Sequence, residues 1–262
     1  MNDNINGYEN EYSFIFALNG KKFRELNPLF QKLLEDIYVV VPEDAIIKAW
    51  RNHYPQKSDI FIRFDGVMKG ISIKKGMCNS VHVEPISEFI HFLIENSVSR
   101  ENVLAYLRYH YADGSTNGRG DVRLSAEEYK KEHQKEIDDL NEELNNPVLL
   151  QKAFERFVLR GNNSNYPIDA IIYGTVEDFI WLTRKDIKEM LNIKEKKYSS
   201  AVHFGPLTCQ PMNRCLNRNP IYEKNRFCVQ LKWHNLHDDI IEMMNYKSMK
   251  KIKTPKIMLQ DI

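Results

Sequence analysis

The residues best suited to chemistry in this sequence are an aspartate and a lysine on neighbouring strands. Asp59 opens the alternating segment DIFIRF, and Lys74 lies in the alternating segment GISIKK. Asp65 and Gly66 between these segments are typical of a tight turn, so residues 59–75 are expected to form an antiparallel hairpin. A carboxylate can hold a divalent cation, and a lysine can position water and stabilise charge that develops on phosphorus. The pair therefore indicates metal-assisted hydrolysis of a phosphodiester.

Side-chain alternation within this hairpin should separate an apolar face from a polar one. The apolar face is expected to hold Ile60, Ile62, Ile71 and Ile73. The polar face is expected to hold Asp59, Phe61, Arg63, Ser72 and Lys74. The isoleucines would then pack into the core while the polar side chains converge on the other side of the sheet.

The segment KSDIFIRFDGVMKGISIKKG resembles the PD-(D/E)XK, or restriction-endonuclease-like, nuclease superfamily. Asp59 matches the first aspartate of its motif, and Lys74 matches its lysine. Ser58 replaces the motif's proline, and Ser72 replaces its second acidic residue. A hydroxyl binds Mg²⁺ more weakly than a carboxylate does, so another acid is needed at such a site. The resemblance covers roughly residues 43–95.

The resemblance implies that this acid comes from a neighbouring element. Glu84 is the first candidate, because it stands at the start of a helix that begins at Pro85 and follows the lysine strand. Glu43 is the auxiliary candidate, on a helix expected to run from Pro42 toward residue 54. Capping and interaction with the helix dipole would explain Glu84 equally well. Asp65 is already explained by its turn.

The same resemblance implies Mg²⁺ as the cofactor, with Mn²⁺ as an alternative, and a backbone carbonyl at Ile73 as a further ligand. Asn79 and His82 are auxiliary candidates for contact with phosphate or water near the metal, although a solvated loop would contain such residues too. Ser80, His82 and Glu84 alternate along one segment, but this spacing does not give the nested hydrogen bonds of a nucleophilic triad.

A second cluster, in HFGPLTCQPMNRCLNRNPIYEKNRF, is rich in amide and guanidinium groups, which suit phosphates and base edges. The candidate nucleic-acid-binding residues are Gln210, Asn213, Arg214, Asn217, Arg218 and Arg226. An ordinary polar loop is the alternative explanation. The basic run KSMKKIKTPK could add contacts to a nucleic-acid backbone. The chain has 37 basic and 36 acidic residues, so only a local patch could attract a polyanion.

Other patterns predict an α/β fold: a restriction-endonuclease-like mixed sheet flanked by helices, in one domain over residues 1–262. Residues 1–12 are expected to be a loose end, and SFIFALNGKKF two short strands around Asn19-Gly20. A helix capped by Asn27 should follow. Residues 113–146 are expected to insert a flexible loop and a long charged helix with a thin apolar stripe. Further strands are expected in IDAIIYG, SAVHF and CVQLKW.

The four cysteines, Cys78, Cys209, Cys215 and Cys228, show no metal-finger spacing, and no secretory leader or long apolar span stands out. A cytoplasmic location is therefore expected, with no membrane partner. The predicted function is a Mg²⁺-dependent endonuclease acting on double-stranded DNA, with pairing into a homodimer. The alternative is a catalytically inactive nucleic-acid-binding or interaction protein that keeps the nuclease fold. An RNA-directed nuclease is not favoured, because the sequence shows no aromatic platform or RNA motif.

Overall fold

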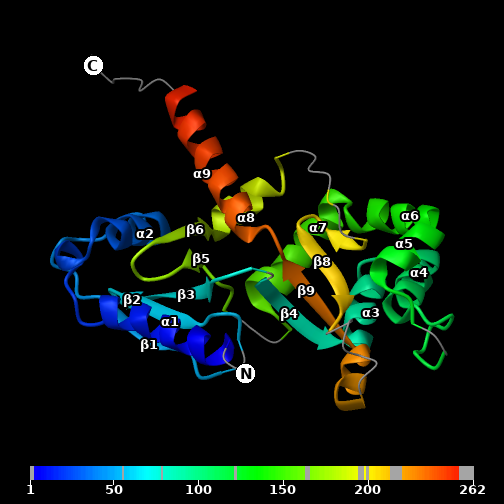
Figure 1. Ribbon diagram of the computed structural model, residues 1–262. Coiled ribbons are helices and arrows are strands. Elements are labelled where there is room, and N and C mark those ends of the chain that lie inside the picture. Colours follow the sequence, from blue (N-terminus) through cyan, green and yellow to red (C-terminus); the bar gives the residue numbers. More distant parts are fainter. Residues whose placement is uncertain are drawn as a thin grey trace. The chain divides into compact units, whose positions relative to one another are not determined.

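The computed structural model describes residues 3–54, 56–77, 79–120, 123–162, 166–193, 198, 201–212 and 220–253. The backbone falls into two compact units, each with helices and its own sheet (Figure 1). Unit 1 consists of Met1–Gly76, Ile168–Met190 and Asn235–Ile262, and unit 2 of Met77–Pro167 and Leu191–His234. The predicted α/β class is confirmed. The expected organisation as one domain with an insertion at 113–146 stays a prediction.

Unit 1 contains a mixed sheet of five strands in the order β1-β2-β3-β5-β6. These strands are β1 (Lys48–Arg51), β2 (Ile60–Phe64), β3 (Val67–Lys74), β5 (Ala170–Gly174) and β6 (Phe179–Thr183). Strands β3 and β5 are parallel, and the other neighbouring pairs are antiparallel. The predicted hairpin over residues 59–75 is confirmed as β2 and β3. Its turn residues, Asp65 and Gly66, both have positive φ, the conformation that Asp-Gly turns favour.

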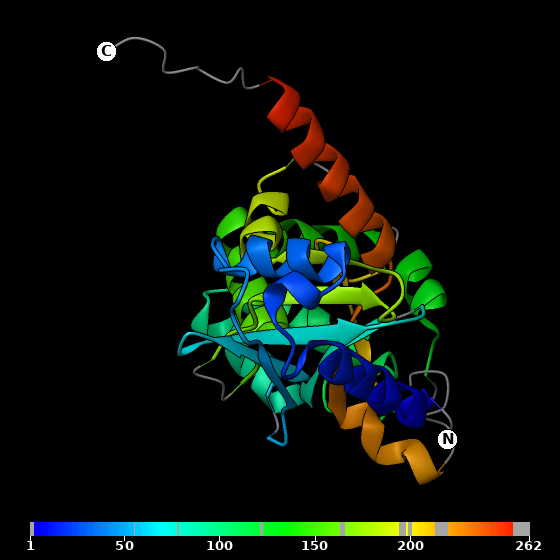
Figure 2. The ribbon, with the colours of Figure 1, turned by 90° about the vertical axis from the view of Figure 1, so that its left-hand side faces the viewer.

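Helices α1 (Asp3–Leu18) and α2 (Pro28–Tyr38) supply the core that packs on this sheet (Figure 2). The core cluster joins Phe14 and Leu18 of α1 to Phe30 and Leu33 of α2 and to the isoleucines of the hairpin. Ile60, Ile62 and Ile71 are fully buried, and Ile73 is 8% exposed. The predicted apolar face is therefore confirmed. The remaining elements of unit 1 are η1 (Phe23–Glu25), α8 (Arg184–Met190) and α9 (Leu236–Lys253).

Two expectations for the first fifty residues are wrong. The stretch read as a loose end and a hairpin is the helix α1, because Phe14 and Leu18, one helical turn apart, are both fully buried. Gly20, with φ of 78°, lies just after the end of the helix, where a turn between two strands was expected. The helix expected from Pro42 is instead a turn followed by β1, in which Ala49 pairs with Ile62. Because it pairs with β2, this segment is a strand although its sequence pattern predicts a helix.

Unit 2 contains an antiparallel sheet in the order β4-β9-β8-β7. Its strands are β4 (Asn79–Pro85), β9 (Cys228–Trp233), β8 (Leu207–Pro211) and β7 (His203–Phe204). Its helices are α3 (Ile86–Glu95), α4 (Arg100–Tyr111), α5 (Ala126–Glu132), α6 (Gln134–Leu144), α7 (Pro147–Phe154), η2 (Glu155–Arg160) and η4 (Pro220–Phe227). The strands expected in SAVHF and CVQLKW are confirmed as β7 and β9.

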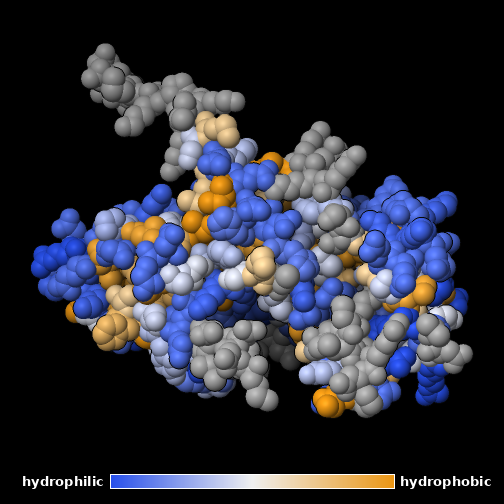
Figure 3. Space-filling view, viewed as in Figure 1, coloured by the Kyte–Doolittle hydropathy of each residue, from blue (hydrophilic) through white to orange (hydrophobic). Residues whose placement is uncertain are grey.

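The charged segment after residue 125 is two helices rather than the single long helix expected. Ser125 and Glu128 form a capping box at the start of α5, and the helix is interrupted at His133 before α6 begins. The predicted apolar stripe of Ile137, Leu140 and Leu144 is fully buried, while the outer surface of both helices is hydrophilic (Figure 3). Within the described segments, no helix is long and apolar enough to cross a membrane.

Candidate active site

The carboxylate of Asp59 lies beside β3 and gathers several donors. Its Oδ2 atom accepts hydrogen bonds from Ser72 Oγ at 3.0 Å and from the backbone N–H of Ile73 at 2.6 Å. Lys74 Nζ lies 3.4 Å from the same oxygen. Lys74 also donates to the carbonyl of Ile73, at 3.3 Å. The structure thus brings together Asp59, Ser72 and Lys74, which the hairpin pattern placed on one face, and adds the backbone of Ile73.

The register of the hairpin explains this convergence. Ile60 pairs with Ile71 in the antiparallel hairpin. Asp59, which precedes Ile60, therefore lies next to Ser72, which follows Ile71. The backbone N–H of Asp59 donates to the carbonyl of Ile71 at 2.8 Å, which fixes the start of the strand. Ser72 is buried, whereas the side chains of Asp59 and Lys74 are 26% and 22% exposed. Ser72 therefore orients the aspartate from behind, while the two charged groups reach solvent.

A second carboxylate near Asp59 was missed by the sequence reasoning. Glu11 of α1 accepts a hydrogen bond from Arg51 Nε at 2.9 Å. Burial, and next the negative charge of Asp59, raise the pKa of Glu11, while Arg51 and Lys74 act in the opposite direction. Glu11 is therefore close enough to sense both charged members of the hairpin cluster. Glu11 could have been found from the sequence if residues 3–18 had been recognised as a helix.

Glu84, the acid expected to complete the site, lies on β4 in unit 2. Its side chain is fully buried and its Oε2 atom lies 2.8 Å from Arg156 Nη2 and 3.1 Å from His82 Nε2. Burial acts to raise the pKa of Glu84, but the hydrogen bonds and charges of His82 and Arg156 outweigh it and lower that pKa. The charge of Glu84 is thus compensated inside its own unit. Its role as a metal ligand stays a prediction.

The other auxiliary candidates occupy different surroundings. Glu43 lies on an exposed turn before β1. Because Arg51 at the far end of β1 pairs with Ile60, Glu43 lies beyond the end of the strand that is remote from Asp59. Asn79 is buried on β4 opposite Trp233. His82, also buried, packs its ring 5.2 Å from the ring centroid of Phe157.

Most of the cluster expected to bind nucleic acid lies outside the described residues: Asn213, Arg214, Asn217 and Arg218. Gln210 is on β8, paired with Gln230 of β9. Arg226 forms an ion pair with the buried Asp113 at 3.0 Å and donates to the carbonyl of Gly118. Asp113 also accepts hydrogen bonds from Ser115 and from the N–H of Gly120. Arg226 thus stabilises the loop that follows α4.

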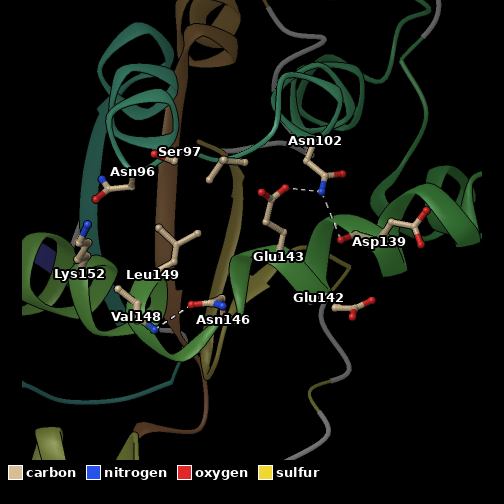
Figure 4. A pocket seen from close by; sticks show the side chains of 11 residues that line it. Asn96, Ser97, Asn102, Asp139, Glu142, Glu143, Asn146, Val148, Leu149 and Lys152 are labelled. Carbon is tan, nitrogen blue, oxygen red and sulfur yellow. Dashed lines mark hydrogen bonds between the residues drawn. The ribbon is translucent and has the colours of Figure 1, made fainter.

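A pocket in unit 2 is acidic rather than basic (Figure 4). Glu143 accepts hydrogen bonds from Asn102 at 2.6 Å and from Ser99 Oγ at 2.7 Å. Burial opposes ionisation of Glu143, but these hydrogen bonds lower its pKa, so the group stays ionised. Asp139 and Glu142 also line the pocket. This negative charge does not suit a nucleic-acid backbone.

No cluster of three or more His, Cys, Asp or Glu side chains able to hold a metal ion occurs among the described residues. The Asp59 region offers two carboxylates and the carbonyl of Ile73, all oxygen donors of the kind that Mg²⁺ prefers. The repulsion between Asp59 and Glu11 is what a divalent cation would relieve. By its chemistry, this set of oxygen donors fits a magnesium ion.

The mixed five-stranded sheet with its Asp–Lys hairpin has a restriction-endonuclease-like fold. Among solved structures, the chain is similar to the crystal structure of restriction endonuclease MspI in complex with its cognate DNA. The TM-score is 0.53 at 15% sequence identity, over 84% of this chain and 87% of that chain. No protein-family model and no curated protein matches the sequence. The fold expected from the hairpin motif is confirmed.

Proposed function

We propose that this chain is a metal-dependent endonuclease that hydrolyses phosphodiester bonds in DNA. The carboxylate of Asp59, hydrogen-bonded to Ser72 and to the backbone of Ile73 beside Lys74, is the observation that carries the proposal. The fold likeness to MspI, whose crystal structure contains its cognate DNA, supports DNA as the polymer. Double-stranded DNA, a symmetric homodimer and a cytoplasmic location belong to the same proposal.

Asp59 and Glu11 would hold the metal, with the carbonyl of Ile73 as a further ligand. When bound, Mg²⁺ or Mn²⁺ supplies a Lewis acid for the phosphoryl oxygens and lowers the pKa of a bound water. Arg51 neutralises Glu11 in the absence of a cation, at a distance of 2.9 Å. Burial and next the charge of Asp59 raise the pKa of Glu11, and the contribution of Asp59 supports this assignment because it makes the two carboxylates neighbours.

Lys74 supplies the positive charge for the reaction itself. Its ammonium is held between the carboxylate of Asp59 and the carbonyl of Ile73, and is partly open to solvent. From there it can orient the attacking water and stabilise the negative charge that develops on the phosphoryl oxygens. Ser72 keeps the Asp59 carboxylate turned toward Lys74. A serine at this position therefore contributes orientation, and Glu11 contributes the missing charge.

Glu11 is a better candidate for the second acid than Glu84. The carboxylate of Glu84 has Arg156 and His82 as buried partners, and metal binding would leave the Arg156 charge uncompensated in the interior. Glu11 shares its electrostatic surroundings with Asp59 and Lys74, the two residues that match the motif. We therefore assign Glu84 to the integrity of unit 2 and Glu11 to the metal.

One observation favours a second candidate function. Ser72 stands where the motif has a carboxylate, which is what an inactive descendant that only binds nucleic acid would show. Such a protein would bind DNA without cutting it under any divalent cation. The two functions differ only in the chemical step, so a cleavage assay separates them.

The test incubates the purified full chain with double-stranded DNA, single-stranded DNA and RNA, in Mg²⁺, in Mn²⁺ and in EDTA. We expect DNA cleavage that requires the divalent cation and that Lys74→Ala removes. Lys75→Ala is the matched control, since it deletes the exposed lysine next along the chain. DNA binding without cleavage in either metal would favour the second function. Equal loss of activity in both variants would show that Lys74 has no special role.

A further inference from the structure

An aromatic residue recurs at every fourth position along the outer face of α1. Tyr8, Tyr12 and Phe16 are 49%, 53% and 85% exposed. Residues four apart lie on the same face of a helix, and each such step advances the axis by about 6 Å. We call Tyr8, Tyr12 and Phe16 the aromatic stripe. It presents three rings to solvent in one line.

The hydrophobic core cluster of unit 1 does not include this stripe. The inner face of α1 is already anchored by Phe14 and Leu18, which are fully buried in the core. Asn10 on that inner face donates to the carbonyl of Gly174 at 3.0 Å. A single exposed aromatic ring is ordinary, but a contiguous exposed row marks a surface that binds something.

The stripe begins at the candidate active site. The guanidinium of Arg51 lies 4.1 Å from the ring centroid of Tyr8 and 5.7 Å from that of Tyr12. The same guanidinium donates to Glu11, which lies between the two tyrosines along the helix. Hydrogen bonding to Tyr12, the largest contribution, and to Glu11 raises the pKa of Arg51. The rings and the second carboxylate of the site are thus joined through one arginine.

The chemistry of the stripe matches a nucleobase. Aromatic rings and a stacked guanidinium bind the flat faces of bases, with little dependence on base identity. The faces of bases within a duplex are covered by their neighbours, so only unpaired nucleotides can use such a surface. At the site end of the stripe, Arg51 pairs with Glu11 and Lys74 pairs with Asp59, and a divalent cation bound by these carboxylates would leave both basic groups to contact a phosphate backbone. The exposed Lys21 follows the other end of the helix.

We propose that the aromatic stripe stacks unpaired bases of the strand that is cut, so that the substrate is double-stranded DNA that carries a single-stranded segment beside the cleaved bond. The proposal rests on the proposed nuclease function and deepens it. Sequence reasoning found no aromatic platform, because residues 1–23 were read as a loose end and two short strands, which would not place residues 8, 12 and 16 on one face.

Phe16→Ala is the most informative variant. The ring of Phe16 is exposed, and the contacts of Arg51 and Glu11 described above do not involve it. Alanine also favours the helix, so the substitution should preserve α1. Binding is measured in an Asp59→Ala background, which prevents cleavage, with a single-stranded oligonucleotide carrying 2-aminopurine and with its fully paired duplex. We expect Phe16→Ala to weaken single-strand binding at least about fivefold and to reduce the quenching of 2-aminopurine. Phe16→Trp should restore both. Duplex binding should not change.

Tyr166→Ala, which removes a 57% exposed aromatic ring from unit 2, is the matched control and should behave like the parent. Unchanged single-strand binding in Phe16→Ala overturns the proposal, even if the wild-type chain cuts duplex DNA in Mg²⁺. Conversion of a dimer to a monomer by Phe16→Ala, with unchanged DNA binding, overturns it in favour of a second copy of this chain. A wild-type chain that binds no DNA overturns the proposed function itself.

Discussion

The two units each place a carboxylate beside basic groups, but with opposite electrostatic results. In unit 1, Asp59 is paired with Lys74 at 3.4 Å, and a second carboxylate, Glu11, is paired with Arg51 at 2.9 Å and stands near enough to Asp59 to be repelled. In unit 2, Glu84 alone is paired with Arg156 at 2.8 Å and with His82 at 3.1 Å. The first group is partly open to solvent, while the side chain of Glu84 is fully buried.

The pKa values of Glu11 and Glu84 are shifted in opposite directions. Burial and next the charge of Asp59 raise the pKa of Glu11, and the opposing effects of Arg51 and Lys74 do not outweigh them. Burial also acts against Glu84, but His82 and Arg156 more than compensate and lower its pKa. A fully buried carboxylate with two basic partners maintains a fold, whereas two neighbouring, partly accessible carboxylates can attract a divalent cation. The number of carboxylates that share the basic groups, two in unit 1 and one in the Glu84 cluster, separates the two roles.

Asp59→Asn should have the largest effect. It keeps the shape of the side chain and removes the charge at the centre of the donors from Ser72, Ile73 and Lys74. We expect cleavage to fall by about a thousandfold or more, because electrostatic contacts that act on the reacting groups have effects of this size. Asp65→Asn, in the turn of the same hairpin, is the control and should cut DNA like the wild type. Activity retained in Asp59→Asn would place the chemistry elsewhere.

Glu84→Gln should affect stability. The substitution leaves Arg156 without its buried counter-charge, and removal of one partner of a buried pair costs about 3 kcal/mol. Urea unfolding at neutral pH should show this loss. Glu88→Gln on the exposed surface of α3 is the control and should change stability by less than about 1 kcal/mol. An unchanged unfolding midpoint in Glu84→Gln would contradict a structural role for this ion pair.

Glu11→Gln should affect metal dependence. With one carboxylate fewer, we expect the Mg²⁺ affinity to fall about tenfold, or about 1.4 kcal/mol, and cleavage to recover at high Mg²⁺. Stability should not decrease, because the raised pKa means that the folded state disfavours the ionised form of Glu11. The measurement is cleavage rate against Mg²⁺ concentration for the variant and the wild type. Superimposable curves would remove Glu11 from the metal site.

The smallest expected effect is a difference in pH dependence between the units. The raised pKa of Glu11 lies above 4.5, so its proton begins to compete with Mg²⁺ at a higher pH than an ordinary glutamate's would. Glu84 has a lowered pKa, so its contribution to stability is present above pH 4.5 and is lost as the pH falls through its folded value. Acidification should therefore weaken metal binding before it removes the contribution of Glu84. Glu11→Gln should move the first transition, followed as Mg²⁺ affinity against pH, to a lower pH and leave the second unchanged.

The sequence alone predicted the hairpin and its cluster, because alternation and an Asp-Gly turn are local signals. Asp59, Ser72 and Lys74 could be brought together by counting residues along two adjacent strands. Glu11 could not be found in this way, since its helix was unrecognised and its partner Arg51 lies on β1, in a segment read as helical. Glu84 was chosen from its place beside Pro85, but only the tertiary structure reveals Arg156 as its partner.

Calorimetric titration with Mn²⁺ of the wild-type chain, Glu11→Gln and Glu84→Gln tests most directly which carboxylate serves the metal. The titrations are made without DNA, at neutral pH and under conditions in which all three proteins are folded by circular dichroism. We predict that Glu84→Gln binds Mn²⁺ like the wild type and that Glu11→Gln binds about tenfold more weakly. Loss of binding in Glu84→Gln, with wild-type affinity in Glu11→Gln, would contradict the assignment of chemistry to unit 1 and structure to unit 2.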